Sequence, residues 1–118
     1  GLDARSGVVA TEGWDNETGI DALDFAINLS DVPLAGIVYT DIDRDGMMQG
    51  LNVTSTLALA RAAQLPVVAS GGVTTLSDLQ ALKDAFAADT ALLMGAITGR
   101  AIYEGTLELA AGQALFDA

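Results

Sequence analysis

A repeated three-part unit constrains the fold of this chain more than any other feature. Each unit contains a short apolar run, a polar turn with glycine, and a longer amphipathic segment. The apolar runs at residues 36–40, 66–69 and 91–94 are short and rich in β-branched or aliphatic side chains, as buried strands are. Strands that alternate with helices are typical of a parallel sheet, so we predict an α/β fold.

Apolar residues at helical spacing predict helices at residues 20–29, 53–63, 76–86 and 106–115. The third of these has the clearest apolar stripe. Either Thr74 or Thr75 is the expected N-cap, and Asp78 in the first turn complements the helix dipole. Residues 6–17, between the first strand and the first helix, are predicted to form a long polar loop.

The length of 118 residues suits one domain, whereas a closed (βα)₈ barrel needs about 200 to 250 residues. Anything barrel-like must therefore be partial. We predict a single domain over residues 1–118, built from about four βα units. Leu2 and Asp3 are expected to end a strand whose beginning lies upstream.

The charge of the chain argues against nucleic-acid binding. Acidic residues outnumber basic ones by 16 to 5, which gives a net charge of −11. No basic patch could neutralise a run of nucleic-acid phosphates, so neither DNA nor RNA is an expected partner. A small phosphorylated ligand would have to be held by local backbone N–H groups.

Cysteine and histidine are absent, which removes thiol catalysis, sulfur-ligated metals and the commonest general base. Chemistry must come from carboxylates, hydroxyls and backbone groups, and no metal is expected. The sequence has no apolar run of about 20 residues and does not begin like a signal peptide. A cytoplasmic protein without a membrane partner is therefore predicted.

Two glycine-rich turns follow predicted strands, at residues 70–73 and 98–100. Glycine lets the backbone approach an anion, and helix starts supply unpaired N–H donors. A phosphate site is one interpretation. The other is that Gly71, Gly72 and Gly99 only shape tight turns.

Three further side chains are candidates for chemistry. Asp3 at a strand end has the position of a general acid or base, although a loop or capping carboxylate is the commoner role. Thr40 either supports Asp3 or is a strand-favouring residue. Trp14 either stacks on a flat heterocycle or docks on the protein surface.

The alternating carboxylates Asp41, Asp43 and Asp45, followed by Gly46, invite comparison with a calcium loop. An EF-hand loop has a bidentate Glu six residues after that glycine. Here the position is Asn52, so calcium is disfavoured.

Five segments carry a family resemblance, namely residues 2–5 (LDAR), 12–14 (EGW), 39–46 (YTDIDRDG), 69–73 (ASGGV) and 99–105 (GRAIYEG). In this order they resemble the C-terminal half of the phosphoribosylformimino aminoimidazole carboxamide ribotide isomerases of histidine biosynthesis. The resemblance covers essentially the whole chain and implies βα units 5–8 of a (βα)₈ TIM barrel, with the first strand truncated. The cyclase subunit of imidazole glycerol phosphate synthase is similar in two segments and is the alternative.

The resemblance implies an intramolecular oxidoreductase that converts an aminoaldose to an aminoketose by an Amadori rearrangement, without a cofactor. It makes Asp3 the catalytic acid and Thr40 its supporting residue. It implies contacts with a phosphorylated substrate for Arg5, Trp14, Asp45, Ser70, Gly71, Gly72, Gly99 and Arg100. Met47 and Met48 depart from the family pattern, which leaves the contacts of their loop open.

By the same resemblance, a second catalytic aspartate and a second phosphate site belong to an N-terminal half-barrel that this sequence does not contain. The isolated chain is therefore expected to be inactive. Either that half or a second copy of the chain is expected to cover the open edges of the sheet. A non-catalytic half-barrel that self-associates and binds phosphate is a further alternative.

Overall fold

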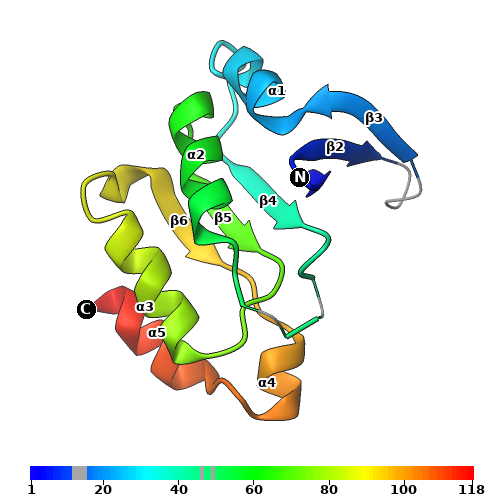
Figure 1. Ribbon diagram of the computed structural model, residues 1–118. Coiled ribbons are helices and arrows are strands. Elements are labelled where there is room, and N and C mark those ends of the chain that lie inside the picture. Colours follow the sequence, from blue (N-terminus) through cyan, green and yellow to red (C-terminus); the bar gives the residue numbers. More distant parts are fainter. Residues whose placement is uncertain (12–15, 46, 49) are drawn as a thin grey trace.

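The computed structural model describes residues 1–11, 16–45, 47–48 and 50–118 (Figure 1). The strands are β1 (Leu2–Arg5), β2 (Val8–Thr11), β3 (Asn16–Asp21), β4 (Ile37–Asp41), β5 (Val67–Ser70) and β6 (Leu93–Ala96). The helices are α1 (Ala22–Leu29), α2 (Val53–Ala63), α3 (Leu76–Ala85), α4 (Arg100–Glu104) and α5 (Leu109–Asp117), and a short 3₁₀ turn covers Thr90–Leu92.

All six strands form one sheet in the order β3-β2-β1-β4-β5-β6. The strands β1, β4, β5 and β6 are mutually parallel. A helix is the next element after β4, β5 and β6, whereas β1 is followed by β2 and β3 before α1 begins. The predicted α/β fold with a parallel sheet is therefore confirmed. The three predicted strands begin one or two residues later than expected, because Gly36 and Pro66 precede β4 and β5 and the 3₁₀ turn precedes β6.

The predicted long loop at residues 6–17 is wrong over its described part. β2 and β3 form an antiparallel hairpin on the far side of β1, so the sheet contains more than parallel strands. Ser6 and Gly7 connect β1 to β2, and both have positive φ, at 51° and 79°. Two such residues match the twist of a tight hairpin.

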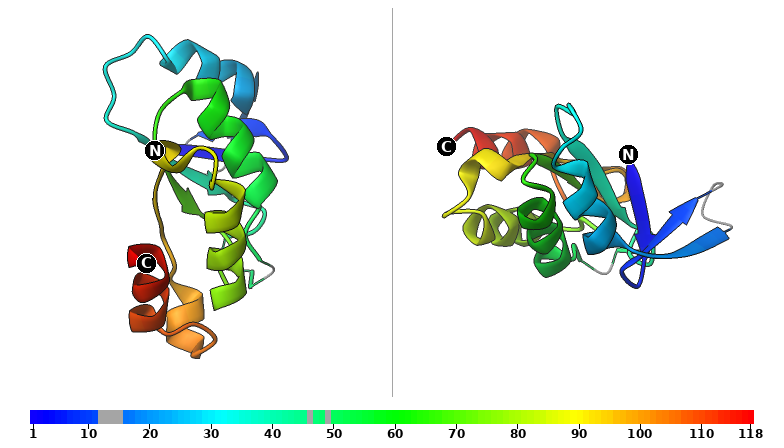
Figure 2. Two further views of the ribbon diagram at one scale, coloured as in Figure 1. Left: turned by 90° about the vertical axis from the view of Figure 1, so that its left-hand side faces the viewer. Right: turned by 90° about the horizontal axis from the view of Figure 1, so that it is seen from above.

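The hydrophobic core lies between the sheet and the helices. The helices α1, α2 and α3 lie side by side on one face of the sheet (Figures 1 and 2). Alternate strand residues face them, as shown by the buried Ile37, Tyr39, Val67 and Ala69. The smallest extent of the molecule, 20 Å, corresponds to these two layers.

The opposite face of the sheet is partly open to solvent. Val38 in β4 is 37% exposed and Met94 in β6 is 56% exposed. Side chains that alternate with the buried set point to this face, which corresponds to the interior of a barrel. An apolar face of this kind is costly in water unless another surface covers it.

Local capping explains where the helices begin. Asp78 Oδ2 accepts hydrogen bonds from the backbone nitrogens of Thr74 and Thr75, at 2.8 and 3.0 Å, so the predicted start of α3 is confirmed. α5 begins at Leu109 and not at residue 106. The Thr106 hydroxyl instead donates to the Thr74 carbonyl at 2.7 Å and holds the segment after α4 against the start of α3.

None of the helices in the described part of the chain combines the length and apolar character that crossing a bilayer requires.

Candidate active site

The parallel register aligns three polar residues in neighbouring strands. Ser70 ends β5 and Thr40 is the second-last residue of β4, whereas Asp3, which was expected to end its strand, is the second residue of β1. Asp3 in β1 pairs with Thr40 in β4, and Thr40 pairs with Ser70 in β5. Residues paired across a sheet point to the same face, and this face is opposite to that of the buried Tyr39. We name Asp3, Thr40 and Ser70 the polar row. Thr40 and Ser70 are each only 8% exposed, so the row lies at a sheltered edge of the open face.

The turn after β5 is shaped by two glycines with positive φ, 97° at Gly71 and 89° at Gly72. A Cβ atom on Gly71 would lie 2.5 Å from the Asp41 carbonyl oxygen, and one on Gly72 would overlap the Gly50 carbonyl oxygen. Both positions therefore require glycine to fold, which supports the interpretation of this pair as turn residues.

The second glycine turn has a different character. A Cβ atom on Gly99 would meet no atom within 4 Å, and its φ is −131°. Gly99 is the N-cap of α4, and Arg100 is its first residue. The open space at Gly99 allows a ligand to approach the backbone.

The two turns enclose a pocket of about 150 Å³. This volume suits a small group better than a drug-sized ligand, which needs about 300 Å³ or more. Its lining combines both turns with the loop after β4: Asp45, Met48, Ser70, Gly71, Gly72, Val73, Ile97, Thr98, Gly99 and Arg100. Six of the residues inferred from the sequence are therefore brought together here.

Thr98 belongs to the second glycine turn, and its side chain has an unusual environment. Its Oγ1 atom is buried and has no hydrogen-bond partner within the described ranges. Thr98 lines the 150 Å³ pocket and also a smaller cavity beside α5. No spacing rule would have singled out this hydroxyl, because its burial depends on how α4 and α5 pack.

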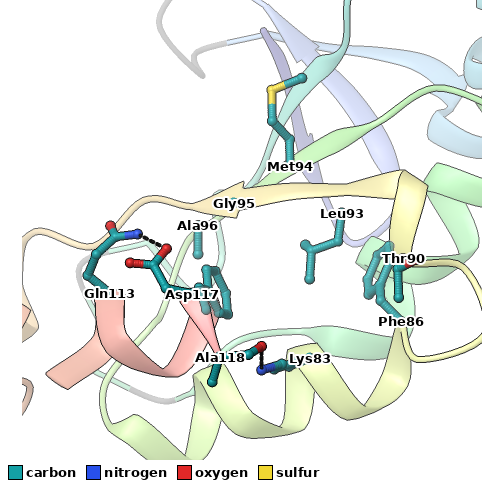
Figure 3. Close-up of a pocket in the computed structure, with 11 residues that line it drawn as sticks. Lys83, Phe86, Thr90, Leu93, Met94, Gly95, Ala96, Gln113, Asp117 and Ala118 are labelled. Atoms are coloured by element: carbon teal, nitrogen blue, oxygen red, sulfur yellow. Dashed lines mark hydrogen bonds between the residues drawn. The ribbon is translucent and has the colours of Figure 1, made fainter.

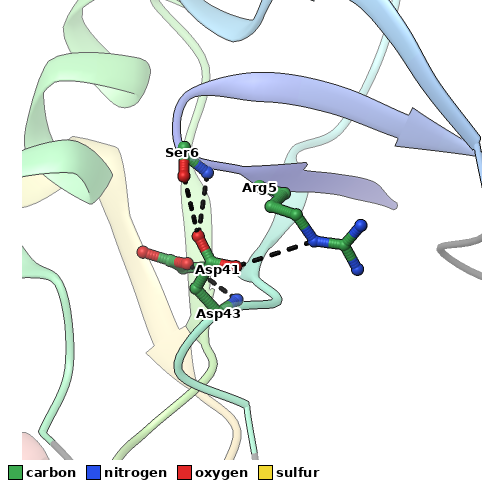
Figure 4. Close-up of polar contacts among 4 residues, drawn as sticks. All are labelled: Arg5, Ser6, Asp41 and Asp43. Carbon is green, nitrogen blue, oxygen red and sulfur yellow. Dashed lines mark hydrogen bonds and ion pairs between the residues drawn. The ribbon is translucent and has the colours of Figure 1, made fainter.

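Arg5 does not line this pocket. Its Nε atom lies 3.6 Å from Asp43 Oδ1 in a half-exposed ion pair (Figure 4). Asp43 Oδ2 also accepts hydrogen bonds from the backbone nitrogen and the hydroxyl of Ser6, at 3.0 and 3.1 Å. This contact between the turn after β1 and the loop after β4 could not be read from the sequence, because Ser6 and Asp43 are 37 residues apart.

Asp41 connects the same loop to α2. Its Oδ1 atom accepts from the Asp43 nitrogen at 3.1 Å, and its Oδ2 atom accepts from the Asn52 side chain at 3.0 Å. Burial raises the pKa of the neighbouring Tyr39 from 10.0 to about 12, and the Asp41 carboxylate adds to this shift. The carboxylates of Asp41 and Asp43 are thus used to hold the loop. Across the described residues, no group of three or more acidic side chains is arranged to hold a metal ion.

A larger cavity, of about 450 Å³, lies away from the polar row, between β6, α3 and α5 (Figure 3). Phe86 and Leu93 line it, and Lys83 Nζ donates to the Ala118 carbonyl at 2.9 Å beside it. Met94 is among the lining residues, although its side chain lies on the side of β6 opposite to Phe86 and Lys83 (Figure 3). No sequence-predicted site residue is among its lining residues, and it borders the outer edge of β6.

Trp14 and Gly46 fall outside the described residues, so the expected role of Trp14 stays a prediction. The two glycine turns, Asp45 and the polar row lie at one end of the parallel strands. This is the end at which α/β barrels hold their reactive groups.

Comparison with known proteins agrees with this arrangement. The family described as "Histidine biosynthesis protein" matches residues 1–108. Three relatives each carry the name 1-(5-phosphoribosyl)-5-((5-phosphoribosylamino)methylideneamino) imidazole-4-carboxamide isomerase. The Azoarcus sp. (strain BH72) protein is 51% identical over 118 residues, which are 100% of this chain and 46% of the relative.

The Dinoroseobacter shibae protein is 57% identical over 110 residues, covering 93% of this chain and 44% of the relative. The Acinetobacter baumannii (strain SDF) protein is 54% identical over 117 residues, covering 99% of this chain and 46% of the relative. The chain therefore spans just under half the length of these relatives. With its four βα units it has the fold of half a (βα)₈ barrel, and it belongs to the histidine biosynthesis protein family.

Proposed function

We propose that this chain forms one half of a sugar-phosphate isomerase whose substrate is a phosphorylated aminoimidazole carboxamide ribotide. The reaction would be an Amadori rearrangement of an aminoaldose to an aminoketose. Such a rearrangement moves protons within one molecule, so acid–base groups suffice. The observation that carries the proposal is the alignment of Asp3 with Thr40 and Ser70 beside the 150 Å³ pocket.

In this proposal Asp3 donates a proton to the ribose ring oxygen as the ring opens. Thr40, adjacent to Asp3 in the parallel register, orients the carboxyl group or the substrate. A second carboxylate would remove the proton from the neighbouring sugar carbon, and the resulting enol would become the ketone. That second carboxylate would come from the other half of the barrel.

The pocket between the glycine turns would hold one phosphate of the substrate. Backbone N–H groups at Gly99 and in the turn after β5 are the donors, and Arg100 supplies positive charge. Arg100 also lies 3.8 Å from Glu104. In a chain with a net charge of −11, recognition of the anion would depend on these local groups, because the overall field repels it.

The partner in this proposal is an N-terminal half-barrel that pairs with β6 and covers the open sheet face. Val38 and Met94 would then be enclosed inside the barrel. Residues 1–118 would act as a single half-barrel domain. A second copy of the chain is the alternative partner, and it would cover the same face without supplying the second carboxylate.

Kinetics of Asp3→Asn test the proposed role. The variant chain is assembled with the N-terminal half of the Azoarcus relative and assayed with the ribotide. The substitution keeps the size of the side chain and removes its ionisable proton, so we expect kcat to fall about 10² to 10⁴-fold. The substrate KM should change little.

Asp31→Asn is the matched control, because Asp31 is an exposed carboxylate outside the proposed site. It should leave kcat unchanged. A kcat for Asp3→Asn equal to that of the control would show that Asp3 is not the acid.

A further inference from the structure

The turn between β1 and β2 contains a residue in a conformation that its side chain disfavours. Ser6 has φ 51°, in the left-handed region that residues other than glycine, asparagine and aspartate rarely adopt. Gly7, the next residue, accepts such a φ without strain. Something outside the turn must therefore help to hold Ser6.

Asp43 supplies that contact from a segment 37 residues away. Its Oδ2 atom accepts from the Ser6 nitrogen at 3.0 Å and from the Ser6 hydroxyl at 3.1 Å (Figure 4). The ion pair with Arg5 is longer, at 3.6 Å, and both side chains are roughly two-fifths exposed. Exposed ion pairs contribute little, so the two bonds to Ser6 are the main part of this contact.

This contact lies immediately beyond the two residues proposed to carry the chemistry. Asp3 is three residues before Ser6, and Thr40 is three residues before Asp43. Between the Asp3–Thr40 pair and the Ser6–Asp43 contact, the Ile42 nitrogen donates a hydrogen bond to the Ala4 carbonyl at 2.9 Å. This bond extends the pairing of β1 with β4. β1 otherwise pairs with β4 over only three residue pairs. The Asp43 carboxylate therefore links the segment that follows β1 to the segment that follows β4.

We propose that Asp43 is a positioning residue that holds the ends of β1 and β4 together and thereby sets the relative placement of Asp3 and Thr40. It acts through Ser6 and does not touch the substrate. This inference rests on the proposed function for its effect on catalysis. Its structural part concerns the chain alone.

Amide hydrogen exchange on the isolated chain tests the structural part. Asp43→Ala removes the Oδ2 atom that accepts both hydrogen bonds from Ser6, whereas the Ile42 hydrogen bond to Ala4 keeps its own donor and acceptor. A net hydrogen bond changes an opening equilibrium by up to roughly tenfold. We therefore expect Ile42 to exchange roughly threefold to tenfold faster in Asp43→Ala. The control is Asp89→Ala, which removes a comparable contact between distant segments, at 2.7 Å from Arg61, and should leave Ile42 unchanged.

Kinetics of the assembled barrel test the effect on catalysis. Asp43→Ala should lower kcat roughly tenfold with little change in KM, because a misplaced acid lowers the rate of the chemical step. Asp43→Asn keeps an acceptor oxygen for Ser6, so its kcat should fall less than that of Asp43→Ala. In a Ser6→Gly background the backbone strain is absent. Asp43→Ala should therefore lower kcat much less there than it does with Ser6 present.

Unchanged Ile42 exchange in Asp43→Ala would overturn the inference, as would a kcat loss of equal size with Ser6 and with Gly at that position. Equal kcat values for Asp43→Ala and Asp89→Ala would overturn it too. Failure of the proposed function would look different. The unmutated assembly would then have no turnover, while Ile42 exchange would still respond to Asp43→Ala and support the structural part of the inference.

Discussion

Gly71 and Gly99 both follow strands of the parallel sheet, but the structure requires glycine at only one of these positions. Gly71 has φ 97°, and the space beside its Cα atom is filled by the backbone of Asp41. Gly99 has a negative φ and open space beside it. Because both residues line the same pocket, comparing them separates folding from access to the ligand.

We expect Gly71→Ala to lower the free energy of unfolding by about 2 to 4 kcal/mol, from left-handed strain plus overlap with backbone atoms. Gly99→Ala should change it by less than about 0.5 kcal/mol. Urea unfolding of the two variants measures both values. Equal stability of the two variants would mean that the turn after β5 does not need its glycine.

Tyr39 links stability to alkaline pH. Its pKa is raised from 10.0 to about 12, first by burial and then by Asp41. Between these two pH values the unfolded chain loses the phenol proton and the folded chain keeps it, so stability falls as pH rises from 10 towards 12. The shift corresponds to a loss of roughly 2 to 3 kcal/mol. In Tyr39→Phe, denaturant unfolding should lose this part of the pH dependence, whereas an unchanged slope would contradict the assignment.

At the scale of elements, the start of α2 is tied to the loop after β4 through Asn52. The Asn52 Oδ1 atom accepts from the Ser55 nitrogen at 3.2 Å as the helix cap, and its Nδ2 atom donates to Asp41 at 3.0 Å. Aspartate caps helices as well as asparagine does. Only asparagine, however, can also donate to a carboxylate.

Asn52→Asp should therefore destabilise the chain by about 1 kcal/mol or more, since it replaces a hydrogen bond by two facing carboxylates. Thermal unfolding measures this loss. The reverse exchange at the N-cap of α1, Asp21→Asn, is the control. Among the described residues, Asp21 accepts side-chain hydrogen bonds from the backbone nitrogens of Leu23 and Asp24 alone, so this exchange should be nearly neutral. Equal effects at both caps would count against the contact with Asp41.

The sequence predicted the elements whose pattern is local. The stripe of α3 and the apolar runs of β4, β5 and β6 follow from periodicity, and their bounds were correct to within one or two residues. The hairpin β2 and β3 was missed. The turn that leads from β1 into β2 is Ser6-Gly7, without the Asn-Gly or Asp-Gly signal of tight hairpins, and Asp43, far away in sequence, supports this turn.

The candidate site was predictable to the extent that it depends on strand ends. Asp3, Thr40 and Ser70 lie at one level of neighbouring parallel strands, so their alignment follows from the order of the βα units. Asp3 was expected at the end of its strand, but β1 continues to Arg5. The roles of Asp43 and Thr98 were not predictable, because each depends on contacts between segments distant in the chain. The contact of Arg5 with Asp43 was not predictable for the same reason, because it joins two segments distant in the chain.

At the scale of the whole molecule, the sheet has one covered and one open face. Helices cover the face of Tyr39, whereas Val38 and Met94 are exposed on the other face. On the side of β1 away from β4, the strand β2 of the hairpin pairs with β1. This pairing was not predicted from the sequence. β6 is the last strand of the sheet, and the 450 Å³ cavity borders it. A completing half-barrel would therefore pair at β6 and fill the open face.

The most direct measurement is turnover of the ribotide by mixtures of this chain with the N-terminal half of the Azoarcus relative, at increasing molar ratio. The chain alone should show no turnover, because half of the acid–base pair is missing. Activity should rise with added partner and reach a plateau at equal concentrations, where sedimentation shows a one-to-one complex. Turnover by the chain alone at the rate of the mixture, or an inert one-to-one complex, would contradict the proposal that this chain is half of an isomerase barrel.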